Sequence, residues 1–436
     1  MKNKILPLLY SAIAISFVGC GDNYKWDTNN VSALEGKYET RDKSLDVNQS
    51  EQNRIAKSVA QRFLYANRGV AGISVSIMHD DHSTFNFAYG CLKLRDDVEE
   101  SGILDYETGD RDNCQEPLLP TSRMKLGSLT KTTVARTILT IDDSSDYDFS
   151  INDPITKHLA DDILSLGDLS GITVKNLLYH TSGLSTKLQP GATVQETIKT
   201  ALDDGRLSTP NQYYKYNNIG YIILGQIIKH VTNSDSWEGE VQKRLDKSLG
   251  SNAFLFPQPA NQNWLQTEDN SWLHGESGTL VEGNQSLATG YQFHNDTFIS
   301  VLNISGADIA NSAGSLIGTV PDTTRWMHHL VTNEGGLLSE EYFKNIILDG
   351  VYVDDYISHL SWNMGAGLGF EQNQNAFFHL GAITGYSCNS VYSKNEKITI
   401  SACINGSGAL ADFPYELLNE MYPYRKAYLP ATSSSH

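Results

Sequence analysis

Positive charge is scarce in this sequence. Among its 436 residues, Lys and Arg total 33 against 51 Asp and Glu, which gives a formal net charge of −18 at pH 7. No long basic run offsets this balance, and a surface this acidic repels phosphate backbones. We therefore expect no nucleic acid among its partners. The 40% share of hydrophobic residues excludes wholesale disorder.

Sequence motifs for metal sites and for α/β-hydrolases are missing. None of the five cysteines lies in a C-x-x-C spacing, and the sequence has no H-E-x-x-H. It also has no G-x-S-x-G, the nucleophile motif of α/β-hydrolases. The sequence therefore predicts no metal site and no cofactor, and any nucleophilic serine must stand in another context.

Long hydrophobic runs are absent apart from one near the start. Lys2 and Lys4 precede the uncharged run Ile5–Val18, which is too short to span a bilayer comfortably. The run ends in Phe17-Val18-Gly19-Cys20, which resembles the lipobox of bacterial lipoproteins, although Phe17 replaces the usual Leu. Residues 1–20 are thus a predicted signal peptide with lipidation at Cys20. We expect a periplasm-facing lipoprotein of the bacterial cell envelope, or a secreted protein.

The four remaining cysteines predict two disulfides, although four cysteines allow three pairings. Cys388 and Cys403 are placed symmetrically about the polar segment Lys394–Lys397, and both flanks have the composition of strands. A hairpin with a four-residue loop would bring these two cysteines opposite each other. Cys91 would then pair with Cys114 across a charged segment.

The order of predicted elements indicates an α+β fold. Helical spacing marks residues 50–68, 128–141, 174–179, 194–202, 219–231 and 323–331. Strand patterns lie near both ends, at 72–90 and 367–404, and the acidic segment 92–120 has no regular pattern. This predicts an antiparallel sheet flanked by helices, with an all-helical domain inserted into it. The predicted parts are a tether at 21–48, a domain at 49–430 with sheet at 49–120 and 360–430 and helices at 121–359, and a tail at 431–436.

The nucleophile candidate is Ser128, which opens a helical run and is followed by Lys131 in an S-x-x-K motif. This spacing places Ser and Lys on one helix face, where the amine lowers the cost of removing the hydroxyl proton. The motif alone is a weak signal, since Ser122 and Lys125 also match it. We prefer Ser128 because it follows a flexible glycine and begins a helix, whereas Ser122 precedes a strand-like stretch.

Two further motifs could complete a site. Tyr216-Asn217-Asn218 lies between helices, so that Tyr216 could reach the serine proton and Asn218 a substrate amide. A phenol acts as a base only if a nearby cation such as Lys131 lowers its pKa. On a terminal strand, His379-Leu380-Gly381-Ala382 combines a small Gly381, which lets substrate backbone approach, with an oxyanion-hole N–H from Ala382. A lone strand histidine is more often structural.

Together these motifs resemble the penicillin-recognising serine hydrolases, specifically the class C β-lactamase branch with its D-alanyl-D-alanine carboxypeptidases, D-aminopeptidases and esterases. Further agreement comes from three stretches, namely 172–184 (ITVKNLLYHTSGL), 216–225 (YNNIGYIILG) and 313–326 (AGSLIGTVPDTTRW). The resemblance covers roughly residues 50–425. We assign His180, within HTSGL, a structural role in its loop and no catalytic role.

The resemblance implies a role for each motif residue. Ser128 would be acylated, Lys131 would take part in proton transfer, and Tyr216 would be the general base that later activates water. Asn218 would hold the substrate amide side chain, and His379 would occupy the position of the family's KTG lysine. The N–H groups of Ser128 and Ala382 would form the oxyanion hole.

Two departures from the family pattern affect the expected substrate. His379 replaces a lysine, and Leu380 stands where a hydroxyl would bind a substrate carboxylate. We therefore expect an ester or a D-amino-acid peptide or amide as substrate, either a small molecule or a peptidoglycan-type peptide. A D-alanyl-D-alanine carboxypeptidase or class C-type β-lactamase is the alternative, and a non-catalytic cell-envelope binding protein is the second.

Overall fold

The computed structural model describes residues 48–104, 113–188, 192–212, 214–250, 253–256, 287–301, 310–345, 376–406, 408 and 410–422, and the backbone of 273–274, 279–280 and 371–373. The predicted signal peptide with Cys20, residues 21–47 of the tether, the strand expected near Gly367–Phe370 and the tail lie outside the described residues. In the described part, no helix combines the length and the apolar character needed to cross a bilayer.

A seven-stranded antiparallel sheet forms the centre of the fold, with the strand order β11-β12-β13-β14-β1-β2-β3. Both ends of the chain contribute to it, as the sequence predicted. Its strands are β1 (Val70–His79), β2 (Thr84–Leu94), β3 (Cys114–Pro117), β11 (Glu371–Asn373), β12 (Ala376–Ile383), β13 (Tyr386–Ser393) and β14 (Ile398–Gly406).

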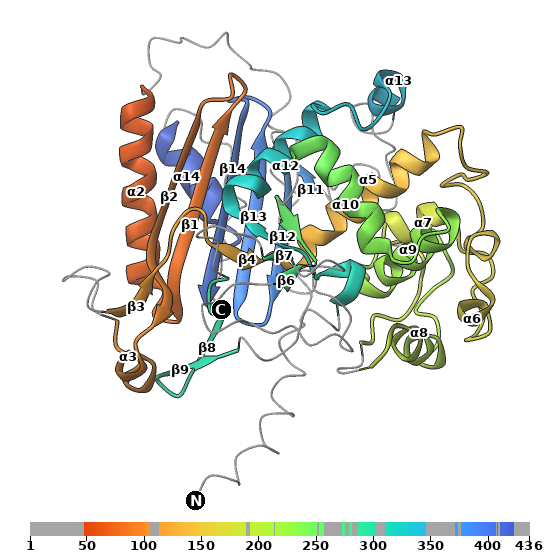
Figure 1. The fold of residues 1–436 in the computed structure, drawn as a ribbon, viewed down its shortest axis with the longest axis horizontal. Coiled ribbons are helices and arrows are strands. Elements are labelled where there is room, and N and C mark those ends of the chain that lie inside the picture. Colours follow the sequence, from red (N-terminus) through yellow and green to blue (C-terminus); the bar gives the residue numbers. More distant parts are fainter. Residues whose placement is uncertain are drawn as a thin grey trace, which may run out of the picture.

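Helices cover both faces of this sheet. On one face, α2 (Gln49–Ala66) and α14 (Phe413–Met421) lie side by side, and α12 (Val320–Thr332) lies on the other (Figure 1). In α2, the buried Ala56, Val59, Ala60 and Leu64 recur at helical spacing and pack against the β1 side chains. Because β1 and β14 are covered on both faces, almost all of their residues are buried.

A second group of helices lies beside the sheet, on the side where α12 packs (Figure 1). At its centre, α9 (Asn218–Val231) is buried on nearly its whole circumference. Its neighbours are α5 (Thr130–Asp142), α7 (Val174–Leu178), α8 (Val194–Asp203) and α10 (Trp237–Leu249), and the short α6 (Asp161–Leu164) lies at the outer edge of the group. The sequence analysis located α5, α7, α8 and α9 but not α10.

The segment predicted as all-helical also contains short strands. The strands β4 (Arg123–Lys125), β10 (Ile317–Thr319) and β5 (Phe254–Leu255) form a small antiparallel sheet. The pairs β6 (Leu273–His274) with β7 (Thr279–Leu280), and β8 (Tyr291–His294) with β9 (Thr297–Ser300), form two more ladders. Strands of two to four residues are too short for an alternating pattern, so the sequence could not reveal them.

Both predicted disulfides are present, Cys91–Cys114 and Cys388–Cys403. Cys388 and Cys403 are directly opposed in the β13–β14 ladder, which places this bridge where the hairpin argument expected it. The acidic segment near 92–118 is more regular than expected, since it contains the end of β2, α3 (Asp96–Ser101) and β3. The first bridge joins β2 to β3.

Candidate active site

Ser128 lies in a single 3₁₀ turn, η3 (Gly127–Leu129), which leads directly into α5. Gly127 enables this turn, because its φ of +53° is unfavourable for other residues and an added Cβ would lie 2.8 Å from the backbone N of Ala382. The Thr130 hydroxyl donates to the Gly127 carbonyl at 2.7 Å. Ser128 itself is half-buried, so a fixed backbone presents a partly accessible hydroxyl.

Lys131 lies one turn after Ser128, and its Nζ is 3.0 Å from Ser128 Oγ. The same Nζ donates to the carbonyl of Ala313 at 2.7 Å, and the side chain is fully buried. Ala313 ends the 3₁₀ turn η5 (Asn311–Ala313). It also begins the stretch 313–326, which the sequence analysis matched to the family pattern without giving Ala313 a role. Its carbonyl oxygen therefore orients the amine toward the serine.

The competing S-x-x-K match has a different geometry. Ser122 is buried, and its hydroxyl accepts the Leu119 N–H at 3.0 Å. Lys125 ends the strand β4 rather than following in a helix, and its ammonium lies 5.9 Å from the ring centroid of Tyr386. Of the two matches, the one at Ser128 has the geometry that nucleophile activation needs.

Tyr216 comes from the loop that precedes α9, and its ring centroid is 4.9 Å from Lys131 Nζ. The cation that the sequence argument required beside this phenol is thus in place. Asn217 caps the helix: its side chain accepts the N–H groups of Ile219 and Gly220 at 2.8 and 3.3 Å. Asn218, the predicted amide-binding residue, is the first residue of α9 and is half-buried.

His180 holds the backbone on both sides of Tyr216, at Lys215 and at Asn217. Its backbone carbonyl accepts the Lys215 N–H at 2.9 Å, and its Nδ1 accepts the Asn217 N–H at 3.0 Å. Its ring packs on the Tyr216 ring with centroids 4.5 Å apart. Burial, followed by the charge of Lys131, holds the pKa of His180 well below its ordinary value. The sequence analysis assigned His180 a structural role in its loop and did not connect it with Tyr216.

Tyr221 is a second phenol near the lysine, with its ring centroid 5.7 Å from Lys131 Nζ. Its hydroxyl donates to the Leu178 carbonyl at 3.2 Å. Burial, with Tyr216 and Tyr179 nearby, raises the pKa of Tyr221 well above its ordinary value. Tyr221 therefore stays protonated, which leaves Tyr216 as the candidate base.

The strand β12 runs against the nucleophile turn. A Cβ on Gly381 would lie 2.0 Å from the Leu126 carbonyl oxygen, so only glycine lets the strand pack there. We had predicted that this glycine admits substrate backbone, whereas the structure shows that it admits the turn that carries Ser128. Ala382, the predicted oxyanion donor, is exposed and adjoins the same turn.

His379 is buried on β12, and its Nδ1 is 2.6 Å from the Leu380 carbonyl oxygen. Because a carbonyl only accepts, Nδ1 carries the proton and Nε2 of the neutral ring is an acceptor. Burial, and then the charge of Lys131, lowers the pKa of His379 to about 3. At neutral pH this histidine therefore supplies no positive charge in the lysine position of the family.

Comparisons with known proteins show the family and the fold of the chain. A family model described as Beta-lactamase matches residues 49–420. The D-amino acid amidase from Ochrobactrum anthropi has a similar fold, with a TM-score of 0.62 and 18% identity over 86% of this chain and 99% of that chain. The octameric penicillin-binding protein homologue from Pyrococcus abyssi has a TM-score of 0.61 and 21% identity over 85% of this chain and 76% of that chain.

Two curated relatives match shorter parts of the chain. An unguisins hydrolase from Aspergillus violaceofuscus is 23% identical over 61% of this chain, and the protein named flp from Staphylococcus aureus is 22% identical over 40% of it. The matched regions span 43% and 34% of these relatives, less than half of their length. The family match covers most of the present chain, which therefore belongs to the β-lactamase family of serine hydrolases.

Proposed function

We propose that this protein is a hydrolase that forms an acyl-enzyme on Ser128 and acts on esters or on D-amino-acid amides and peptides. The observation that carries the proposal is the 3.0 Å contact between Ser128 Oγ and the fully buried Nζ of Lys131. The ring of Tyr216 beside the same amine adds a second group able to take a proton. A surface serine has no such partners.

In the acylation step, Ser128 Oγ attacks the substrate carbonyl carbon while its proton passes to the Lys131–Tyr216 pair. Charge develops on the carbonyl oxygen, and we assign the N–H groups of Ser128 and Ala382 as the donors that stabilise it. The bond to the leaving group then breaks, and the proton is delivered to the departing amine or alcohol. The product of this step is the Ser128 ester.

Deacylation requires a water molecule and a base. Tyr216 is suited to this role because its backbone is anchored on both sides by His180 and its ring lies beside the Lys131 ammonium. The base removes a proton from water, the hydroxide attacks the acyl carbon, and Ser128 leaves with the proton returned to Oγ. The Lys131 ammonium would stabilise the phenolate of Tyr216 before it takes the proton and after it has passed the proton to Oγ.

The surroundings of β12 favour substrates without a carboxylate near this strand. Neutral His379 offers a lone pair on Nε2 instead of a positive charge, and Leu380 offers no hydroxyl. A carboxylate placed there would lose hydration without gaining a charged partner. An amide or ester group carries no such cost, and an amide N–H can donate to Nε2.

The comparisons support a D-amino-acid substrate class. The solved D-amino acid amidase is similar over 99% of its own chain, and another similar structure is a D-stereospecific amidohydrolase from Streptomyces. Both names describe amide hydrolysis rather than β-lactam binding. A peptide or amide of a D-amino acid therefore ranks ahead of penicillin as the substrate.

The test combines intact mass with product release. Purified protein is incubated with p-nitrophenyl acetate, D-phenylalanine amide, L-phenylalanine amide or benzylpenicillin, each beside Ser128→Ala and Ser122→Ala. We expect turnover of the ester, release of ammonia from the D-amide faster than from the L-amide, and slow or no penicillin hydrolysis. Ser128→Ala should lose roughly 10³-fold or more of the activity.

Ser122→Ala is the matched control, since it changes the other S-x-x-K serine and should keep the activity. Rapid penicillin hydrolysis, or a stable penicillin adduct, would favour the β-lactamase or carboxypeptidase alternative. Failure of every probe to acylate Ser128 in folded protein would favour a non-catalytic binding protein. Equal activity of Ser128→Ala and wild type would refute the proposed nucleophile.

We also propose that the protein is exported and lipid-anchored through Cys20. The support is the signal-like pattern of residues 1–20 and the two disulfides, which persist in oxidising compartments. Cys20→Ala should move the protein from the membrane fraction to the soluble exported fraction when it is expressed in bacteria. Retention of that variant in the membrane fraction would contradict lipidation at Cys20.

A further inference from the structure

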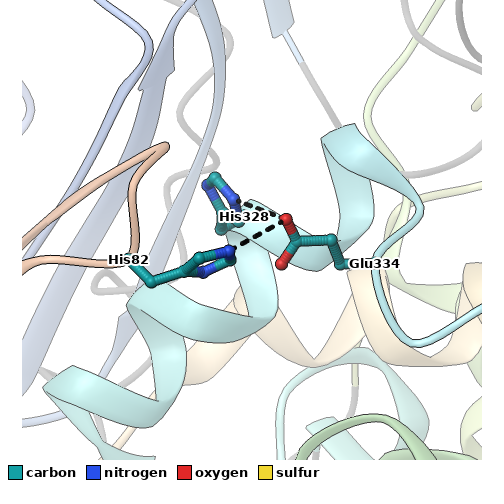
Figure 2. Close-up of side chains that lie close together, drawn as sticks. All are labelled: His82, His328 and Glu334. Atoms are coloured by element: carbon teal, nitrogen blue, oxygen red, sulfur yellow. Dashed lines mark ion pairs between the residues drawn. The ribbon is translucent and has the colours of Figure 1, made fainter.

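Two histidines and a glutamate from distant parts of the chain converge at the end of α12 (Figure 2). His82 lies in the turn between β1 and β2, His328 in the last turns of α12, and Glu334 just beyond its end. One ligand atom from each lies within 4.8 Å of the other two. Neither the β1–β2 turn nor α12 supplies a residue to the candidate active site.

The spacing of these atoms suits a shared ion better than direct contacts. Glu334 Oε1 is 3.4 Å from His328 Nε2 and 3.7 Å from His82 Nε2. Direct hydrogen bonds between such groups are about 2.7–3.2 Å long. In a tetrahedral zinc site with bonds of about 2.0–2.1 Å, neighbouring ligand atoms lie about 3.3–3.4 Å apart. The 3.4 Å distance has this spacing and the 3.7 Å distance is close to it, so both are compatible with ligands of one ion.

The second nitrogen of His328 has its own partners. Nδ1 lies 3.3 Å from the Thr399 hydroxyl and 3.9 Å from a carboxylate oxygen of Asp80. In metal-bound histidines, the ring nitrogen that does not bind the metal usually contacts a carboxylate, a carbonyl or water, which fixes the ring orientation. Thr399 and Asp80 contact His328 Nδ1 in this way, and Nε2 faces Glu334. Since His328 is 1% exposed, its orientation is set by packing.

The fourth coordination position would be taken by water. The side chain of His82 is 59% exposed, so the cluster is open to solvent on that side. The neighbouring His329 does not belong to the group, since its Nε2 lies 3.7 Å from the other oxygen of Glu334, Oε2, and its Nδ1 lies 2.9 Å from the Ser248 hydroxyl.

We propose that His82, His328 and Glu334 bind one divalent transition-metal ion, with Zn²⁺ the best fit to two imidazoles and a carboxylate. The ion would join the β1–β2 turn to the end of α12, and so tie a hairpin of the central sheet to the helix that covers it. The site is separate from Ser128 and does not depend on the proposed hydrolase activity. It also departs from the sequence analysis, which predicted no metal.

The test measures metal binding directly. Purified protein is dialysed against a chelator, titrated with Zn²⁺ by calorimetry, and analysed for bound zinc after gel filtration. We expect one equivalent, a higher melting temperature with Zn²⁺, and the visible absorption of a tetrahedral centre when Co²⁺ replaces it. His82→Ala and Glu334→Gln should each weaken binding at least tenfold.

His82 and Glu334 are chosen because both are partly exposed, whereas loss of the buried His328 could prevent folding. His294→Ala, at an exposed histidine that ends β8, is the matched control and should bind Zn²⁺ like wild type. Ester hydrolysis should be unchanged in the His82 variant. Absence of stoichiometric binding to wild type, or full binding by both ligand variants, would overturn the proposal.

Discussion

At the scale of single residues, the candidate site depends on which groups are protonated and on which atom carries the proton. His379 keeps its proton on Nδ1 through the Leu380 carbonyl, and its low pKa leaves the ring neutral. Lys131 is fully buried, yet it has an acceptor in the Ala313 carbonyl and a second contact in Ser128. The Lys131 amine is thus held beside Ser128, whereas the neutral His379 adds no positive charge on β12.

Leu380→Thr should increase acylation by benzylpenicillin. The new hydroxyl offers a carboxylate one hydrogen bond, worth about 0.5–1.5 kcal/mol, or roughly two- to tenfold in rate. Leu380→Val is the matched control because it has the shape of threonine without the hydroxyl. The measurement is the rate of penicillin adduct formation, and an equal rate for Thr and Val would contradict the carboxylate argument.

His180→Ala should lower kcat with little change in KM. The variant removes the acceptor for the Asn217 N–H and the ring that packs on Tyr216, so the base loses its position. We expect a loss of roughly tenfold to hundredfold, typical of a misplaced catalytic group.

His180→Asn tests whether this effect is positional. Asparagine tolerates the left-handed backbone at this position, where φ is +57°, and its amide oxygen can accept a hydrogen bond. Partial recovery of kcat with Asn is the expected result. If Ala and Asn lose the same activity, or if both change KM alone, His180 does not position Tyr216.

At the scale of elements, the site lies where β12 meets the η3 turn. At Gly127 and Gly381 these elements pack so closely that a methyl group added to either glycine would overlap backbone atoms of the other segment. Each glycine allows one element to pack on the other, so the distance between Ala382 and Ser128 depends on both. The proposed oxyanion hole thus depends on the contact between the two elements.

Gly381→Ala should destabilise this contact. The added methyl would lie 2.0 Å from the Leu126 carbonyl oxygen, and overpacking of this kind costs about 1–3 kcal/mol. Urea unfolding should show the lower stability, and esterase assays a loss of activity. Ala382→Ser, at the neighbouring exposed position, should unfold like wild type. An unchanged stability of Gly381→Ala would show that the strand moves away at no cost.

At the scale of the whole molecule, buried neutral histidines link stability to pH. Burial holds the pKa of His180 well below its ordinary value, that of His379 at about 3 and that of His329 at about 4. In the unfolded chain these histidines protonate near pH 6.5, so below that value the unfolded state binds more protons. Their stabilising contribution is present above pH 6.5 and is lost as the pH falls toward 3.

The free energy of unfolding should therefore decrease as the pH is lowered from 6.5 to 4.5. His379→Gln should reduce the slope of this free energy against pH. One proton corresponds to about 1.4 kcal/mol per pH unit at most. Urea denaturation at several pH values measures both slopes, and carboxylates common to the two proteins cancel in the comparison. Identical slopes would mean that His379 is charged in the folded protein.

Much of the fold was predictable because its signals are local. Helical spacing indicated α2, α5, α8 and α9, and the symmetric cysteines indicated the β13–β14 hairpin. The motifs also sufficed to identify the family. The helix α10 was not recognised, and the strands β4, β5 and β10 are too short to show a period.

The sequence by itself determined the features that depend on neighbours in the chain: the S-x-x-K pair one helical turn apart, the capped start of α9 beside Tyr216, and the family. Only the tertiary structure decided which groups serve these residues. Ala313 orients Lys131 from 182 positions away, Gly381 packs against the turn of Ser128, and His82 meets His328 and Glu334 across the sheet. Such contacts depend on the packing of whole elements, which no local spacing encodes.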